Sequence, residues 1–292
     1  LGETIAADII TRCRVLRSLD YGLAIRMVGA MWMAIEEIVR KEKPDFALSF
    51  CIDRYSMDIL ARIVELHDIP FAEMTASVLP GQIQFLRRGR GLPTILPSQE
   101  QIDKGIAALT DPLFAPAYVQ LGQSYGLGRF LKTFAHHELR GAYFNLIRRW
   151  RHDPLNCHYL DALKRLEHKI GYRDLAQSRF LDVGWKGKFD RVHAADRVFL
   201  ALQLYPEASM DYWLESHALL RYYDVVERQA QLLAAGGFSV FVKDHPLMFG
   251  FRQEELYRRI RRVSNATFIP HSVSGRYLVS NCQATVTLTG TV

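Results

Sequence analysis

The four residues Lys243-Asp244-His245-Pro246 place an ammonium group, a carboxylate and an imidazole in one short turn. A lysine ammonium and a histidine ring N–H both bind phosphate oxygens. The same turn is also compatible with a plain surface loop, because Asp and Pro favour turns for backbone reasons alone. The residue types therefore leave two interpretations open, a phosphate contact and an ordinary turn.

Two other segments carry groups that suit a nucleotide. The segment from Gln203 to Glu207 holds an amide and a carboxylate, and a carboxylate accepts hydrogen bonds from ribose hydroxyls. Thr289-Gly290-Thr291 offers hydroxyls and backbone amides in a turn that contains glycine, which is a common way to hold phosphate. The three segments together predict a nucleotide site, provided that they meet in space.

The elements around these segments bring them together. Each segment follows an apolar run with the length of a buried strand, and helical patterns separate the runs. This alternation is typical of a doubly wound parallel sheet, where ligands bind at the carboxyl ends of the strands. We therefore expect one crevice lined by all three segments. The predicted strands are 197–204, 238–242, 267–269 and 284–288, and the predicted helices are 212–235, 253–262 and 274–281.

The N-terminal part has the same alternating order. A helix at 22–41, a strand at 45–51, a helix at 53–67 and a short strand at 71–74 predict a second parallel sheet. Strand signals then become scarce, with a loop at 81–93 that bears Gly and Arg, followed by helical stretches at 130–150 and 159–170. We expect an N-terminal Rossmann-like domain at 1–95, a helical insertion or linker at 96–188 and a C-terminal Rossmann-like domain at 189–292.

The charge of the chain favours an anionic partner. The formal net charge is +6 and the pI is near 9.1, which suits phosphorylated substrates, an anionic membrane face or nucleic acid. Nucleic acid is not the expected partner, because the basic residues lie mainly on predicted helices and are not interleaved with aromatic residues on a sheet. Arg148, Arg149 and Arg151 favour peripheral contact with the anionic inner face of a membrane.

Targeting signals are absent from the sequence. It has no run of eighteen uncharged apolar residues, and Leu1-Gly2-Glu3-Thr4 lacks the basic-then-apolar order of a signal peptide. The four separated cysteines predict reduced thiols, and we expect a cytoplasmic protein. The chain begins with Leu1 and stops at Val292 after a predicted strand, so we expect the first strand of one domain to be missing and the C-terminal domain to be truncated.

Three stretches resemble the capsule polysaccharide biosynthesis family of bacterial glycosyltransferases. They are 200–209, 242–246 and 286–292, and their order and spacing match that family. Members have the GT-B architecture of two Rossmann-type domains, and the best understood ones transfer Kdo from its CMP-activated form. The His-Pro pair is also similar to that of bacterial GT-B sialyltransferases. The resemblance covers the last hundred residues or so, and the first eighty more loosely.

The resemblance implies roles for the residues of the three stretches. It places Lys243, His245 and the adjoining Pro246 at the donor phosphate, with His245 as a catalytic residue. It implies that the Thr289-Gly290-Thr291 turn binds the phosphate from the other side, and that Gln203 and Glu207 line the nucleotide pocket. The resemblance further implies that a nucleotide sugar is the substrate, with a CMP-linked donor expected, and that no cofactor is needed. The acceptor is a capsular or surface glycan or a glycolipid.

The N-terminal domain is expected to supply a catalytic carboxylate across the cleft. Asp53 follows a predicted strand directly, with Arg54 beside it, and its alternative role is the N-cap of the next helix, for which Ser56 competes. Glu73 and Ser77 follow the next strand and, with Arg54, are candidates for acceptor contact. The chain contains no Asp-x-Asp motif, which predicts transfer without a metal ion. His136-His137-Glu138 lacks a third ligand at a suitable spacing, so no metal site is expected there.

Two alternatives stay open. A glycerophosphotransferase of the teichoic acid type uses CDP-glycerol and has a similar His-Pro turn, so only the identity of the donor separates it from a sugar transferase. A non-catalytic basic α/β protein that binds nucleotides or nucleic acid is the other alternative. The donor sugar and the oligomeric state are open as well.

Overall fold

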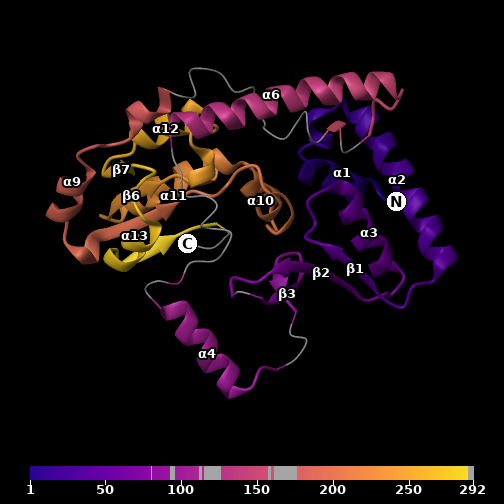
Figure 1. Ribbon diagram of the computed structural model, residues 1–292, viewed down its shortest axis with the longest axis horizontal. Coiled ribbons are helices and arrows are strands. Elements are labelled where there is room, and N and C mark those ends of the chain that lie inside the picture. Colours follow the sequence, from indigo (N-terminus) through magenta and orange to yellow (C-terminus); the bar gives the residue numbers. More distant parts are fainter. Residues whose placement is uncertain are drawn as a thin grey trace. The chain divides into compact units, whose positions relative to one another are not determined.

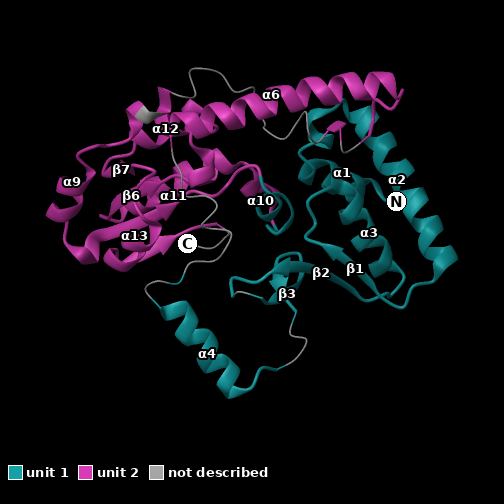
Figure 2. Ribbon diagram, viewed as in Figure 1, with its two compact units in different colours: residues 1–121, 207–215 teal, residues 122–206, 216–292 magenta. Residues whose placement is uncertain are grey.

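The computed structural model describes residues 1–79, 81–92, 96–111, 114, 126–156, 159–160 and 176–288. The chain divides into two compact units (Figures 1 and 2). The first unit comprises residues 1–121 and 207–215, and the second comprises residues 122–206 and 216–292. None of the described helices combines the length and the apolar character that crossing a membrane requires.

The first unit contains a mixed four-stranded sheet. Strand β1 (Ala47–Phe50) runs parallel to β2 (Phe71–Ala76), and α3 (Tyr55–Leu66) connects them, as the sequence predicts. Strand β3 (Ile83–Arg87) then pairs antiparallel with β2, and β4 (Arg90–Gly91) pairs antiparallel with β3. The sheet order is β1-β2-β3-β4. Helices α1 (Glu3–Arg12) and α2 (Tyr21–Glu42) precede this sheet in the sequence.

The prediction of a loop at 81–93 was wrong. Arg88 and Gly89 both have positive φ, at 47° and 76°, which is the backbone of a two-residue type I′ turn and closes the β3–β4 hairpin. A side chain at position 89 is also excluded, because a Cβ there would lie 2.5 Å from the Trp213 ring. The first sheet is therefore mixed, whereas a parallel sheet was expected.

The segment from Glu207 to Glu215 folds onto the first unit although the chain on both sides of it belongs to the second. It contains helix α10 (Ala208–Tyr212). Tyr212 packs in a core with Ile52 and Ala61, and Arg12 donates a 2.7 Å hydrogen bond to the carbonyl oxygen of Leu214. The single helix predicted at 212–235 is thus wrong at its start, because the described helix α11 begins at Tyr222 and ends at Ala235.

Two of the described helices, α4 and α6, lie in the middle of the sequence, and the helical stretch predicted at 159–170 falls outside the described residues except for its first two positions. Helix α4 (Gln99–Thr110) begins at a capping box in which the Ser98 hydroxyl accepts from the Gln101 amide and the Gln101 side chain accepts from the Ser98 amide. Helix α6 (Leu127–Trp150) is the longest described helix and belongs to the second unit.

The second unit contains a parallel four-stranded sheet, as the sequence predicts. Its strand order is β7-β6-β5-β8, and every neighbouring pair is parallel. The chain moves from β5 outward to β6 and β7, and then returns to pair β8 with the free edge of β5. The strands are β5 (Arg197–Ala201), β6 (Ser239–Lys243), β7 (Ala266–Ile269) and β8 (Ala284–Val286).

Helices cover both faces of this sheet. Phe199, Phe241 and Ile269 lie in one core cluster with Phe189 of α9 (Trp185–Arg191) and Leu278 of α13 (Gly275–Asn281). On the other face α11 contacts β6, and α12 (Glu254–Arg261) contacts β7, where the Tyr257 and Phe268 rings lie 4.8 Å apart. The second unit is therefore a three-layer α/β/α structure of doubly wound form.

Candidate functional site

The return of the chain from β7 to β8 creates a switch point between β5 and β8. In open α/β sheets, ligands bind outside the carboxyl ends of the strands at this point, because the connections leave in opposite directions and open a crevice there. Gln203, two residues beyond the end of β5, donates a side-chain hydrogen bond to the Thr287 hydroxyl beyond the end of β8. The predicted nucleotide-pocket residue Gln203 thus lies at the switch point.

Lys243 is the last residue of β6, so it lies at the carboxyl ends of the strands, as Gln203 does. Its side chain is buried, with 7% of the residue exposed, and its ammonium group makes a long hydrogen bond of 3.4 Å to the Asp244 carbonyl oxygen. Burial lowers the pKa of Lys243, and the negative charge of Asp244 opposes this change. A buried ammonium with one weak acceptor is costly, and an anion bound at this edge would compensate it.

His245 begins the short 3-10 helix η5 (Pro246–Met248). Its Nδ1 accepts a 3.2 Å hydrogen bond from the Leu247 amide, while Pro246 fills the first helical position, where no N–H is needed. Burial lowers the pKa of His245 to about 4. The ring is therefore neutral at pH 7, and because Nδ1 is an acceptor, the proton resides on Nε2.

Asp244 anchors the turn after β6 through buried hydrogen bonds. Both of its carboxylate oxygens accept from Nε of Arg252, at 2.9 and 2.8 Å, and Tyr257 donates its hydroxyl proton to the same carboxylate. Burial raises the pKa of Asp244, but the charge and hydrogen bonds of Arg252 outweigh this and lower it. Asp244 therefore remains an anion inside the protein and serves as an internal anchor.

Arg252 links this anchor to the switch point. Its Nη2 donates a 2.6 Å hydrogen bond to the carbonyl oxygen of Gln203, and its guanidinium lies 5.3 Å from the centre of the Tyr222 ring. The Tyr222 hydroxyl in turn accepts a 2.9 Å hydrogen bond from the backbone amide of Gln203. The turns after β5 and β6 are thus held together by one buried network of Asp244, Arg252 and Tyr222.

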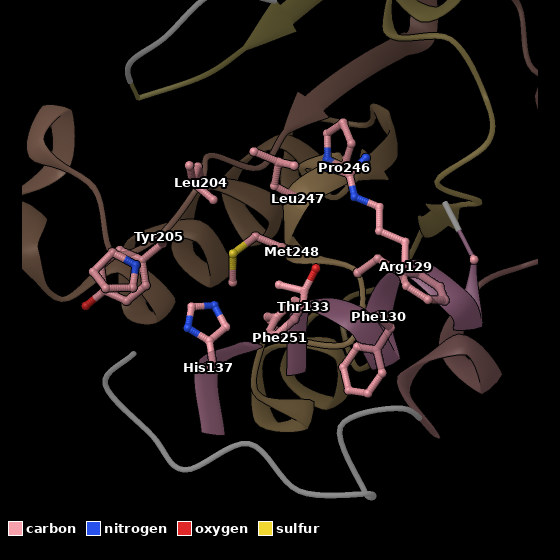
Figure 3. Close-up of a pocket in the computed structure, with 13 residues that line it drawn as sticks. Arg129, Phe130, Thr133, His137, Leu204, Tyr205, Pro246, Leu247, Met248 and Phe251 are labelled. Carbon is pink, nitrogen blue, oxygen red and sulfur yellow. The ribbon is translucent and has the colours of Figure 1, made fainter. Parts of the chain in front are cut away.

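A cavity of about 180 Å³ lies against the same two turns, within the second unit (Figure 3). One wall is formed by Leu204 to Pro206 after β5 and by Pro246 to Phe249 after β6. The opposite wall comes from α6, which supplies Arg129, Thr133 and His137 at a spacing of four residues. Residues four apart lie on one face of a helix, so these three side chains face the cavity together.

The sequence prediction missed both the buried network and the contribution of α6. Arg252 lies eight residues after Asp244 in a region without regular structure, so no periodic pattern connects the two. A signal for α6 exists, since Arg129, Thr133 and His137 recur every four residues, but this spacing alone is common on solvated helices. His137 also packs edge-on against Phe251, with the ring centres 5.9 Å apart.

The remaining donor-site residues are placed as follows. Glu207 belongs to the first unit, where its carboxylate accepts a 2.9 Å hydrogen bond from the Ser209 hydroxyl. Thr289, Gly290 and Thr291 lie outside the described residues. The turns at 203–206 and 243–246 are thus linked through Arg252, and Thr287, which precedes the third segment, contacts Gln203.

The acceptor-side candidates all belong to the first unit. Asp53 has an exposed carboxylate, 3.7 Å from Nε of Arg54. No side-chain N-cap hydrogen bond is found at the start of α3, so neither Asp53 nor Ser56 takes the capping role offered as an alternative. The Ser77 hydroxyl accepts a 3.2 Å hydrogen bond from the Leu79 amide in the turn after β2.

The carboxylate of Glu73 forms hydrogen bonds inside the first unit and is not accessible to an acceptor. The residue is fully buried, and its two carboxylate oxygens accept from the backbone amides of Ile52 and Arg88. These bonds tie the end of β1 and the β3–β4 turn to β2. Both oxygens are occupied, which favours a structural role over contact with an acceptor.

No family model, curated protein or solved structure matches this chain. Among the described residues, no group of three or more metal-binding side chains lies close enough together to hold an ion. What the site can do is therefore argued from its own geometry, which offers a buried ammonium and a neutral imidazole N–H. The cavity is lined by the residues that follow them, from Pro246 to Phe249, and not by Lys243 or His245 themselves.

The lowered pKa of His245 gives a pH prediction. Its value is about 4 in the folded protein against 6.5 for the ordinary group, so the unfolded chain binds more protons between these values. Stability therefore decreases as pH falls from 6.5 to 4, by an amount on the order of 1–3 kcal/mol from this residue. His245→Gln should reduce this slope in urea unfolding experiments at several pH values. An unchanged slope would show that His245 is protonated equally in both states.

Proposed function

We propose that this chain is a GT-B glycosyltransferase that binds a nucleotide-activated donor at the carboxyl edge of the second sheet. The proposed donor is CMP-linked, the candidate sugar is Kdo, and the acceptor is a capsular or surface polysaccharide or a glycolipid. The observation that carries the proposal is Lys243, a buried ammonium with one 3.4 Å acceptor at the end of β6. The resemblance of residues 200–209, 242–246 and 286–292 supplies the donor class.

The electrostatics of this edge suit the departure of a nucleotide. In the transfer, the bond between the sugar's anomeric carbon and the donor phosphate oxygen breaks, and negative charge develops on the phosphate of the released nucleotide. Lys243 supplies a positive charge for that phosphate. His245 adds a hydrogen bond from Nε2–H, and because its pKa is about 4, it acts by donating this bond and keeps its proton.

The acceptor hydroxyl must lose its proton as its oxygen bonds to the anomeric carbon. We propose Asp53 as the base, because its exposed carboxylate is the one candidate of the first unit that has no structural anchoring comparable to that of Glu73. Metal-independent transfer is part of the proposal, since the sequence has no Asp-x-Asp motif and Lys243 provides the charge that a metal ion would otherwise supply.

A donor screen tests this function. The protein is incubated separately with CMP-, UDP- and GDP-linked sugars and with CDP-glycerol, and free nucleotide is measured by mass spectrometry. We expect CMP to be released from a CMP-sugar, and His245→Ala to lower this release by about 10- to 100-fold, the value of one hydrogen bond to a charged group.

His193→Ala is the matched control for that variant. His193 caps a short helix in the same way, with Nδ1 accepting from the Ala195 amide at 3.3 Å, but it lies before β5, away from the strands' carboxyl ends. It should leave CMP release within about twofold of the unmodified protein. Release of CMP from CDP-glycerol alone would select the glycerophosphotransferase alternative, and release from no donor would reject transferase activity.

A further inference from the structure

The C-terminal half of α6 exposes a stripe of large apolar side chains to solvent. The exposed fractions are 71% for Leu139, 57% for Tyr143, 67% for Leu146 and 71% for Trp150. At about 100° per residue, these four positions fall within an arc of roughly 60° on the helix surface. A contiguous apolar stripe of this kind on a soluble unit marks a surface that binds something.

The opposite side of the same helix half is already occupied within the protein. The rings of Phe144 and Tyr159 lie 5.4 Å apart, so Phe144 packs against the chain that follows the helix. The stripe is thus not the packing face of α6. It is a second apolar face, and the described residues leave it open.

The charges beside the stripe identify the kind of partner. Residues 138–153 contain four arginines, Arg140, Arg148, Arg149 and Arg151, and two acidic residues, one at each end of the range. Arg140 and Arg149 lie about 90° to either side of the stripe, so guanidinium groups border it on both flanks. An apolar stripe with an aromatic residue at its end and an excess of cations beside it is the pattern of a helix that lies in the interface of an anionic bilayer.

We propose that the 139–151 surface of α6, consisting of the stripe and its flanking arginines, docks the protein on the surface of an anionic membrane. Leu139, Tyr143, Leu146 and Trp150 enter the region between headgroups and acyl chains, and the arginines contact lipid phosphates. The surface lies parallel to the membrane plane and does not cross it, in agreement with the lack of any described helix that could span a bilayer. The docking residues and the nucleotide-site residues are separate sets, so either function can fail without the other.

Helix α4 provides an internal comparison. It also exposes apolar residues, with Ile102 at 38%, Ile106 at 56% and Leu109 at 49%, but Glu100 and Asp103 stand beside them. The two helices are similar in apolar exposure and differ in charge. Of these two helices, α6 carries the excess of positive charge that attracts anionic lipids.

The test is vesicle sedimentation with the full chain. Vesicles of phosphatidylcholine alone are compared with vesicles that also contain phosphatidylglycerol. We expect binding to the anionic vesicles only, and a decrease in the affinity of about tenfold or more for Leu146→Ser/Trp150→Ser and for Arg149→Gln/Arg151→Gln. The control variant Ile102→Ser/Ile106→Ser on α4 should bind as the unmodified protein does.

Three results would overturn the proposal. The first is no sedimentation with anionic vesicles, and the second is equal binding by the α6 and α4 variants. The third is a larger decrease in melting temperature for Leu146→Ser/Trp150→Ser than for the α4 control, because that decrease would show that the stripe packs inside the protein or against a second copy. Unchanged melting temperatures with selective loss of vesicle binding support the membrane contact.

Discussion

Replacing Asp244 by alanine should destabilise the second unit by about 3–5 kcal/mol, because it leaves the charge of Arg252 buried without its partner. Both side chains are fully buried, and the carboxylate accepts hydrogen bonds from Arg252, Tyr257 and the His245 amide. The loss therefore combines an unpaired buried cation with several broken bonds. Thermal and urea unfolding of the variant measure the effect.

Asp224→Ala is the matched control for this substitution. Asp224 also forms an ion pair with an arginine, Arg259, at 2.6 Å, but the two side chains are 57% and 29% exposed. An exposed pair contributes about 0–1 kcal/mol, since water and salt screen it. If Asp244→Ala costs no more than Asp224→Ala, the buried network does not hold the two turns together as described.

Lys243→Met should have opposite effects on stability and on binding. Methionine fills a similar volume without charge, so removal of the buried ammonium should leave stability unchanged or raise it by about 1 kcal/mol. The same change should weaken binding of CMP by about 100- to 1,000-fold, because a buried positive charge is lost from the proposed phosphate contact. A residue that costs stability and yet is needed for binding is expected at a functional site.

Lys188→Met controls for the general loss of a lysine. Lys188 is 60% exposed and pairs with Asp182 at the surface of α9. It should change neither stability nor CMP binding by more than about twofold in the equilibrium constants. A Lys243→Met variant that is destabilised and still binds CMP would assign Lys243 a structural role.

The sheet of the second unit was predictable from the sequence because its signal is local. Strand β6, for example, reads Ser-Val-Phe-Val-Lys, and its central residues are all buried between two layers of helices. Such strands appear as continuous apolar runs, and the amphipathic helices between them show the helical period. Residues just beyond these strands, among them Gln203, could therefore be assigned to one edge.

Two parts of the fold could not be predicted, because they depend on contacts that leave no local pattern in the sequence. The segment from Glu207 to Glu215 leaves the second unit for the first because Arg12, Arg14 and Arg17, about two hundred positions earlier, bind its backbone and Asp211. The β3–β4 hairpin has exposed polar positions and a turn made by Arg88 with positive φ, which sequence propensity does not predict.

The candidate site also combines features that the sequence predicts with features that only the fold determines. That Lys243 and His245 lie at the carboxyl end of a strand could be predicted, but their protonation could not, because burial lowers the pKa of both. The sequence assigned Asp244 no role, whereas its carboxylate forms an ion pair with Arg252 in the interior. Only the folded chain shows which of the four consecutive residues is held by buried side chains, and this residue is Asp244.

The central claim is that the carboxyl edge of the second sheet binds the nucleotide of a donor, and calorimetric titration with CMP tests it most directly. We predict saturable binding of CMP at pH 7 by the unmodified protein, weaker binding of UMP, and loss of CMP binding in Lys243→Met with Lys188→Met unaffected. Absence of binding, equal affinity for UMP, or full binding by the stable Lys243→Met variant would contradict the claim.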